Sequence, residues 1–425
     1  MLLKECAAVV GIDWADQQHA TCLIELDRQI SENGTLDQEP EAIGQWVAEL
    51  QQQFPGQKIA VCLEQKRGAL IYALMKFDCL ILVPVNPKQL ARFREALGPS
   101  GAKDDPTDAQ LLAELVLRHP EHFRPWQPDD EATRKIRLLS EDRRTFVDDR
   151  TALTNSLKSS LKQYFPLVLK ITDRIFSNLA CALLTRYPSL EKLQAASDDE
   201  LQQFYRDHHC YRQALIEERL QSIRQAKALT SDPAIIESSV LKVQALVGQI
   251  TVLNQTIQRY DDELAALMRD HPDAPIFKSL PGSAAVMAPR LLAAMGTDRE
   301  RLHHAKEVQQ VSGIAPVTKQ SGKTKVVHRR WACNRFLLQT FHEYAAHSIK
   351  QSAWAKACYD MLRANGRKHQ AAIRELAFKW IRIILRCWKD RTMYDESVYI
   401  ASLIKRQSPV VKYLDSSSNE IRKST

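Results

Sequence analysis

Two short apolar runs near the N-terminus each stop at a carboxylate. Residues 9–12 are followed at once by Asp13, and residues 59–63 are followed by Glu64. Short, continuously apolar runs are typical of strands that are buried in a sheet covered by helices. Strand ends can bring residues from distant parts of a sequence into one pocket. The sequence therefore predicts that Asp13 and Glu64 share a site.

The first 125 residues alternate between strand and helix patterns. Two strand-like runs come first, and helix-like and strand-like runs then follow in turn, which is the order of an α/β fold with a mixed sheet and helices packed on it. The expected strands are residues 9–12, 20–26, 58–63 and 80–85, and the expected helices are residues 40–53 and 68–77, with further helix after Pro87.

A second acidic pair, Asp105 and Asp108, begins the next probable helix and lies on one side of it. Clustered carboxylates repel one another unless a cation lies between them. Mg²⁺ prefers such hard oxygen ligands and keeps positions open for phosphate oxygens. Each acidic residue alone is more often a cap or turn residue, and Asp104 is a rival to Asp105. Together, Asp13, Glu64, Asp105 and Asp108 predict a magnesium site for phosphodiester chemistry.

The middle of the chain has the composition of long helices, with no glycine between Gly101 and Gly248. A partner helix is expected at residues 131–164, although Arg143 and Arg150 interrupt its apolar face. Residues 166–235 have the character of an additional helical insertion. The other helix carries an apolar seam of about four heptads, which predicts a coiled coil. Its seam residues are Val243, Leu246, Ile250, Leu253, Ile257, Tyr260, Leu264 and Leu267.

The C-terminal third is strongly cationic. Residues 276–425 hold 27 Lys and Arg against 11 Asp and Glu, whereas residues 1–275 hold 32 against 40. This asymmetry indicates a surface for a polyanion such as nucleic acid. Helices are expected at residues 334–350 and 369–389, and the preceding residues 313–330 have a loop-like, basic composition.

Ser321 in that basic segment is the candidate nucleophile. A serine beside a glycine is ordinarily a turn, but Gly322 permits close approach of a ligand to the backbone. No histidine is obvious as a local base; a metal ion could instead activate Ser321, but only if the carboxylate site reaches this segment. The nearby cations could hold the phosphates beside a cut. These predicted nucleic-acid ligands are Lys319, Lys323, Lys325, Arg329 and Arg330.

Composition narrows the class of protein further. The length of 425 residues predicts two to four structural units, at roughly 100–200 residues per domain. The 9 cysteines form no Cys-x-x-Cys pair, which fits a reducing cytosol better than a disulfide framework. No run of about 18 apolar residues and no secretory signal is visible. We therefore expect a cytosolic protein without a membrane span.

Several short motifs occur in an order that resembles the DEDD transposases of bacterial insertion sequences. That family includes the Piv-like DNA invertases and the bridge-RNA-guided serine recombinases. The motifs that carry the resemblance are Gly11-Ile12-Asp13, Glu64, Lys103-Asp104-Asp105-Pro106-Thr107-Asp108-Ala109, Leu280-Pro281-Gly282, Val311-Ser312-Gly313-Ile314-Ala315-Pro316 and Ser321-Gly322. They agree in order and rough spacing across about two thirds of the chain.

The resemblance implies an architecture and a reaction. Residues 1–125 would form a RuvC-like catalytic domain with the RNase H fold, residues 126–275 a coiled-coil region with an insertion, and residues 276–400 a basic helical transposase domain before a tail at 401–425. It implies that the four carboxylates bind Mg²⁺ and that Ser321 attacks the phosphate.

The resemblance also implies partners for this chain. The enzyme would act on donor and target DNA as a homo-oligomer, a dimer or tetramer, with a guide RNA from its own element. The resemblance allows the carboxylates and the serine of one site to come from different subunits.

Two other functions are compatible with the residues. A hydrolytic nuclease, such as a junction resolvase, would use the carboxylates and a metal-bound water and would not need Ser321. A nucleic-acid-binding protein without catalysis would need neither the serine nor the carboxylates. The leading hypothesis is an insertion-sequence transposase that joins DNA through a phosphoserine.

Overall fold

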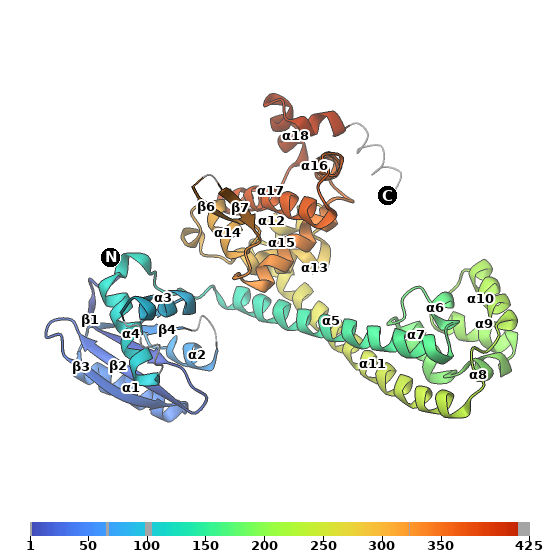
Figure 1. The fold of residues 1–425 in the computed structure, drawn as a ribbon, viewed down its shortest axis with the longest axis horizontal. Coiled ribbons are helices and arrows are strands. Elements are labelled where there is room, and N and C mark those ends of the chain that lie inside the picture. The colour runs from blue at the N-terminus through green and yellow to red at the C-terminus, as the bar shows by residue number, and fades with distance from the viewer. Residues whose placement is uncertain (1, 65–67, 98–103, 323, 415–425) are drawn as a thin grey trace. The chain divides into compact units, whose positions relative to one another are not determined.

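A computed structural model describes residues 2–64, 68–97, 104–322 and 324–414. The chain divides into two compact units, Met1–Pro128 and Asp129–Thr425 (Figure 1). The first is a mixed α/β unit and the second is almost entirely helical, so that the chain as a whole is mostly helical.

The N-terminal unit is built on a five-stranded mixed sheet in the order β3-β2-β1-β4-β5. The central strand β1 is antiparallel to β2 and parallel to β4, β3 is antiparallel to β2, and β5 is parallel to β4. This confirms the predicted mixed sheet. The strands are β1 (Cys6–Asp13), β2 (Gln18–Glu25), β3 (Ser31–Asp37), β4 (Lys58–Leu63) and β5 (Leu80–Pro84).

Strand β3 was not predicted from the sequence. Its residues Ser31–Asp37 are polar, and only Leu36 among them is buried. Backbone pairing with β2, from Gln18↔Asp37 to Ile24↔Ser31, makes this segment a strand. An edge strand that buries so little side chain leaves no apolar alternation for sequence reasoning to find.

Helices cover both faces of the sheet (Figure 1). One core contains Val10 and Ile12 of β1 together with buried residues of α1 (Pro40–Gln53) and α2 (Ala69–Leu74). The other contains Val9 of β1 with residues of α3 (Pro87–Leu97) and α4 (Asp105–Arg118). Successive residues of β1 thus alternate between the two faces, as the pleat requires.

Helix α4 lies directly on β1 at Gly11. A Cβ atom placed on Gly11 would lie 1.9 Å from the carbonyl oxygen of Ala109 and 2.8 Å from the amide nitrogen of Ala113. No side chain fits into that space, so glycine sets the distance between the helix and the strand. The first turns of α4 are thereby held over the carboxyl end of β1.

Two long helices, α5 (Glu131–Tyr164) and α11 (Pro233–Asp270), pack side by side in the C-terminal unit (Figure 1). Lys135 near the start of α5 pairs with Glu263 near the end of α11, so the two helices are antiparallel. All eight seam residues predicted in α11 are buried or half-buried. The predicted pairing of this helix with residues 131–164 is confirmed.

The two arginines that interrupt the seam of α5 have polar partners on α11. Arg143 donates two hydrogen bonds to Asp261, at 2.6 Å and 3.0 Å, and Arg150 donates one to Asn254 at 2.8 Å. A charge in a helix interface is tolerated when such a partner compensates its lost hydration. These pairs align polar with polar positions and therefore favour one register of the two helices.

By length and composition alone, α11 is long and apolar enough to cross a membrane. This differs from the expectation that the sequence has no such segment. The most apolar 18-residue window of α11 has a mean hydropathy of 1.3, and 17% of that window is buried. Core helices of soluble proteins can have the same length and apolar composition. In this structure the seam of α11 packs on α5 and on the helices at the far end of the pair.

Residues 166–232 form a small helical bundle at the end of this pair. Its core joins residues of the bundle with Leu157 and Leu161 of α5 and Val243 and Val247 of α11. The predicted helical insertion is thus a packed extension of the helix pair. Its helices are α6 (Val168–Ile171), α7 (Asn178–Arg186), α8 (Leu190–Ala195), α9 (Asp198–Asp207) and α10 (Gln213–Gln225).

The rest of the C-terminal unit packs around a second core, in which Trp354, Trp380 and Trp388 are buried. The two helices predicted there are present as α15 and α17, and α16 was missed. The helices are α12 (Ala274–Lys278), α13 (Ala284–Met295), α14 (Ala305–Val311), α15 (Arg335–Ser348), α16 (Ala353–Ala364), α17 (His369–Asp390) and α18 (Glu396–Lys405).

The prediction of a loop at residues 313–330 was wrong. The segment contains a β-hairpin of β6 (Val317–Ser321) and β7 (Thr324–His328). Apart from half-buried Val317, its described strand residues are exposed. Two strands exposed on both faces show no alternation of buried and exposed side chains, which is why the sequence pattern gave no strand signal.

The contact at Gly11 leads to a stability prediction. We expect Gly11→Ala to lower the free energy of unfolding of the N-terminal unit by about 2–4 kcal/mol, because the added methyl group must push α4 from the sheet. Urea unfolding followed by circular dichroism measures this. Gly44→Ala in α1 is the matched control: a Cβ there meets nothing within 4 Å, and alanine favours helix. Equal midpoints for both variants would contradict the prediction.

Candidate active site

Strand pairing brings Asp13 and Glu64 to one edge of the sheet. Asp13 is the last residue of β1, and Glu64 directly follows β4. The two strands are parallel with Ile12 opposite Leu63, so the next residue of each lies on neighbouring backbones, which are about 4.8 Å apart in a sheet. Both residues are half-buried.

The alternation of the strands also gives the two carboxylates the same face. Val9 and Ala60 belong to the core under α3 and α4, and Gly11 touches α4 itself. Every second residue of a strand lies on the same face. Asp13 lies two residues beyond Gly11, and Glu64 lies four residues beyond Ala60, so both continue on that face. The two carboxylates therefore lie on the α4 side of the sheet.

Helix α4 adds Asp108 over the same strand. Its neighbour Ala109 lies on Gly11, and the side chain of Asp108 is only 3% exposed. Arg94 of α3 forms an ion pair with this carboxylate. A carboxylate so far removed from water requires a cationic partner, because an unpaired buried charge costs several kcal/mol.

The structure separates the roles of Asp104 and Asp105. Asp104 is the N-cap of α4 and accepts a hydrogen bond of 2.7 Å from the backbone N–H of Thr107. Hydrogen bonds from the side chain and backbone of Thr107 lower the pKa of Asp104. Asp105 is the first helical residue and is exposed. Asp104 caps the helix, so capping does not explain why an acidic residue stands at position 105. Asp105 therefore stays the better candidate for a metal ligand.

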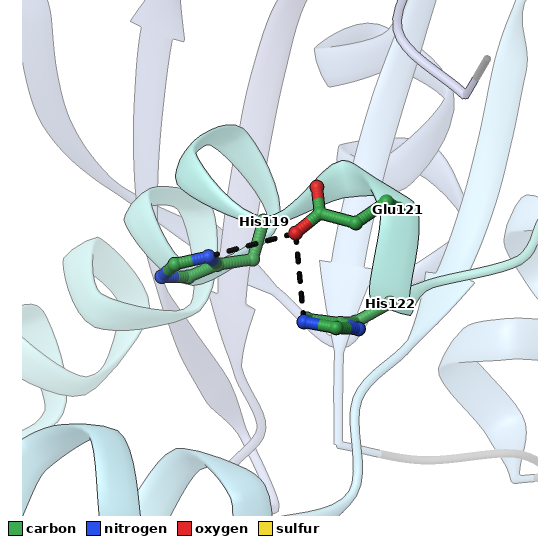
Figure 2. Close-up of side chains that lie close together, drawn as sticks. All are labelled: His119, Glu121 and His122. Atoms are coloured by element: carbon green, nitrogen blue, oxygen red, sulfur yellow. Dashed lines mark ion pairs between the residues drawn. The ribbon is translucent and has the colours of Figure 1, made fainter.

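The four predicted carboxylates do not form a tight cluster of ligand atoms. Within the described residues, His119, Glu121 and His122 form the group of three whose possible ligand atoms lie within 4.8 Å of one another (Figure 2). The side chains of the acidic quartet do not meet this distance, and Arg94 neutralises one member.

The trio in Figure 2 is separate from the acidic quartet. It follows the C-terminal end of α4, where Pro120–His122 forms the short helix η1, eleven residues or about 16 Å of helix from Asp108. Glu121 lies 3.8 Å from Nδ1 of His119 and 3.5 Å from Nε2 of His122. These contacts are ion pairs when the imidazoles are protonated, and all three side chains are exposed.

Sequence reasoning missed His19, which holds the chain just beyond Asp13. His19 is buried in β2, accepts a hydrogen bond of 3.1 Å from the N–H of Ala15 and contacts Gln38 at 2.6 Å through its other ring nitrogen. Trp14 stacks on its ring at 6.5 Å. The turn after Asp13 is therefore anchored from both sides. The available signal was a histidine that begins an apolar strand.

The candidate nucleophile Ser321 is the last residue of β6 and is exposed. It pairs with Thr324 across the turn, and Gly322 has a φ of +57°, in the left-handed region that favours glycine. Lys319 and His328 lie on the face of Ser321, where they help to line a hollow of about 490 Å³. The register places Lys325 on the opposite face. Lys323 lies outside the described residues.

Among the described residues of the hairpin, no histidine lies within hydrogen-bond reach of Ser321. His328 shares its face but pairs with Val317, four residues along β6 from Ser321. That separation is about 13 Å in an antiparallel strand, well beyond a hydrogen bond. The expectation that the serine has no local histidine base is consistent with this geometry.

Arg329 and Arg330 follow β7 and line a second hollow of about 610 Å³. Arg335 and Arg374 add two further cations to it, and Trp331 is 79% exposed beside them. Trp331 was not predicted as a functional residue, because the sequence does not reveal whether an aromatic side chain in a basic segment is exposed or buried.

An acidic site on a mixed sheet and a cationic C-terminal unit are together the features of an enzyme that acts on DNA. Comparison with known proteins agrees. A family model of DEDD transposases of the IS110 type, described as "Transposase", matches residues 10–166, and a second, described as "Transposase IS116/IS110/IS902 family", matches residues 274–360. The two matches together span more than half of the chain, which belongs to the IS110 family of DEDD transposases.

Individual relatives match over long stretches. The chain is 27% identical over 405 residues to "Mini-circle putative transposase for IS117" of Streptomyces coelicolor, covering 93% of this chain and 97% of the relative. It is 24% identical over 304 residues to "Insertion element IS110 uncharacterized 43.6 kDa protein" of the same organism, covering 70% and 74%. It is 24% identical over 302 residues to "Insertion element IS900 uncharacterized 42 kDa protein" of Mycobacterium paratuberculosis, covering 71% and 75%.

The distinct positions of Asp104 and Asp105 lead to a prediction for activity. Asp104→Ser keeps a side-chain oxygen for the cap and should leave recombination within about twofold of wild type. Asp105→Asn should lower it on the order of 100-fold, since loss of a metal ligand removes several kcal/mol of charge stabilisation. Recombination of donor and target DNA measures both. The reverse ranking would show that Asp104 is the ligand.

The ion pair of Arg94 leads to a second prediction. In EDTA, Arg94→Gln should lower the free energy of unfolding by about 1–3 kcal/mol, less than for a fully buried pair because the Arg94 side chain is 25% exposed. Mg²⁺ should then stabilise the variant more than wild type, as a cation replaces the lost arginine. Thermal unfolding with and without Mg²⁺ measures this. Exposed Arg92 on the same helix gives the control Arg92→Gln, and equal Mg²⁺ shifts for all three proteins would refute the prediction.

Proposed function

We propose that this transposase is a site-specific recombinase that mobilises an insertion sequence, with a RuvC-like catalytic domain of the RNase H fold in its N-terminal unit. The observation that carries the proposal is the placement of Asp13, Glu64 and Asp108. Paired parallel strands and the helix over Gly11 put all three on one face at one edge of the sheet. Independent structural causes converge on one location, which a set of unrelated cap residues would not do.

The donor set fits a divalent ion. Membership of a DEDD family points to divalent metal use. Asp13, Glu64, Asp105 and Asp108 offer only carboxylate oxygens, which favours Mg²⁺ over softer metals. Buried Asp108 also takes a cationic partner in the structure, which is the environment a metal would supply. When bound, Mg²⁺ would act as a Lewis acid toward phosphate and hydroxyl oxygens.

Ser321 is the proposed nucleophile of strand cleavage. Its Oγ loses its proton and forms a bond to phosphorus as the bond from phosphorus to the neighbouring deoxyribose oxygen breaks, and that oxygen takes up a proton and leaves as a hydroxyl. Lys319 on the same face can stabilise the charge that develops on the phosphate. Lys323, Lys325, Arg329 and Arg330 are the further proposed contacts to the DNA backbone.

The resulting phosphoserine ester keeps the energy of the phosphodiester bond. A hydroxyl from another strand can attack it in the reverse reaction, so strands are exchanged without ATP. Donor and target DNA must be held together for this exchange. We therefore include assembly as a dimer or tetramer, choice of sites by a bridge-type guide RNA, and action in the bacterial cytosol in the proposal.

The absence of a histidine near Ser321 in the described hairpin favours one alternative, a hydrolytic nuclease in which a metal-bound water cuts the DNA. That enzyme needs the carboxylates alone and forms no bond between protein and DNA. The non-catalytic alternative is disfavoured by membership of a transposase family.

Substitution of Ser321 separates the two enzymes. We expect Ser321→Ala to abolish recombination and the covalent protein–DNA adduct seen on a denaturing gel, because the proposed ester forms on the Oγ of Ser321. The measurement incubates the variant with donor DNA, target DNA, guide RNA and Mg²⁺. Thr324→Ala is the control, since Thr324 pairs with Ser321 on the same face of the hairpin. Normal cutting without an adduct in either protein would establish the hydrolytic nuclease instead.

A further inference from the structure

The hollow beside Arg329 carries an excess of positive charge. It lies between the segment after β7 and helices α15 and α17, and Arg329, Arg330, Arg335 and Arg374 line it. Its carboxylate, Glu343, is engaged by Arg144 at 2.9 Å and Arg290 at 2.5 Å, neither of which lines the hollow. Two cations already neutralise that carboxylate, so the four arginines remain available to an anion.

Arg374 is poised for such an anion. Its Nε is buried without a hydrogen-bond partner among the described residues. Burial and, after it, the charge of Arg329 lower the pKa of Arg374, so that holding the two cations together is unfavourable. A phosphate between them would accept their hydrogen bonds and remove the repulsion, because guanidinium groups match phosphate oxygens in geometry.

Trp331 gives the hollow an aromatic wall. Its side chain is 79% exposed, whereas Trp354, Trp380 and Trp388 are buried in the core. The Arg329 guanidinium carbon lies 4.9 Å from the centre of a Trp331 ring, which orients the indole by a cation–π contact. An indole exposed to this degree beside arginines is the platform on which nucleic-acid bases stack.

Neutral polar groups line the same hollow. Burial lowers the pKa of His342, and the charges of Arg374 and Arg329 also lower it, whereas a hydrogen bond with the Gln370 backbone and the charge of Glu343 raise it. The net shift is downward and favours the neutral imidazole. A neutral imidazole is both a donor and an acceptor, and the amides of Gln339 and Gln370 offer both functions as well. These are the groups that bind the edge of a base, while the arginines suit its phosphate.

We propose that this hollow binds one unpaired nucleotide of a single strand, with the base stacked on Trp331 and its phosphate at Arg374 and Arg335. A duplex hides the faces of its bases, so the exposed indole favours an unpaired one. A volume of about 610 Å³ is sufficient for a nucleotide. The inference rests on the proposed function only in that the protein handles nucleic acid. It requires neither Ser321 nor the carboxylates.

The test measures equilibrium binding to the full-length protein in EDTA, which prevents cutting. The probes are fluorescein-labelled oligothymidylate and oligouridylate of roughly ten nucleotides and a duplex of mixed sequence, followed by fluorescence anisotropy. We expect Trp331→Ala to weaken single-strand binding about 5- to 100-fold, the range for loss of one stacked base, and duplex binding by less than about twofold. Trp331→Phe should recover part of the loss.

Matched controls exclude general effects of the substitutions. Tyr211→Ala removes another aromatic side chain, 71% exposed and in the helical bundle, and Arg386→Gln removes an 84% exposed guanidinium of α17. Neither should change single-strand affinity by more than about twofold. Arg374→Gln should lower the slope of log K against log salt by about 0.7, as expected for one lost phosphate contact, whereas Trp331→Ala should leave the slope unchanged.

The outcomes decide both the proposal and the source of the strand. If Trp331→Ala loses affinity for oligouridylate alone, the site binds RNA. If it loses affinity for oligothymidylate alone, the site binds DNA, and a loss for both means that the site accepts an unpaired nucleotide of either kind. Wild-type affinity of Trp331→Ala for both single strands, or an equal loss for the duplex, overturns the proposal. Because Ser321→Ala is scored by its covalent adduct, failure of the recombinase mechanism would be seen separately.

Discussion

The close contact between α4 and β1 is the constraint on which the acidic site depends. Gly11 allows the backbone of Ala109 to approach the strand within a distance that any side chain would prevent. The helix that carries Asp108 is therefore fixed relative to the strand that ends in Asp13. Parallel pairing of β1 with β4 then places Glu64 beside them. One missing methyl group thus contributes to the geometry of three carboxylates.

Charge compensation recurs at two ionic pairs of the described structure that are buried or half-buried. Arg94 pairs with Asp108 under α4, and Arg143 pairs with Asp261 between the long helices. Each partner offsets the free energy of hydration that the charge loses on burial, which would strongly destabilise the fold if the charge were unpaired. The hollow beside Trp331 differs. Among the described residues that line it, Glu343 is the one carboxylate, and that carboxylate already pairs with Arg144 and Arg290. That imbalance is what makes it a binding site for phosphate in our proposal.

Sequence reasoning succeeded where a residue pattern reflects burial. The runs before Asp13 and Glu64, and the heptads of residues 243–267, predicted strands and a paired helix that the structure contains. It failed for β3 and for the hairpin of β6 and β7, because those strands are held by backbone pairing and expose nearly all of their side chains. Backbone hydrogen bonds are available to every sequence and leave no periodic signal.

The sequence by itself determined which groups are available for chemistry: acidic residues at the ends of apolar runs, a serine beside glycine, and a cationic C-terminal third. These are local properties of residue type and spacing. Only the tertiary structure decided that Asp108 is buried against Arg94 and that Trp331 lies open to solvent. Burial and charge pairing depend on neighbours that are distant in sequence, and folding alone brings those neighbours together.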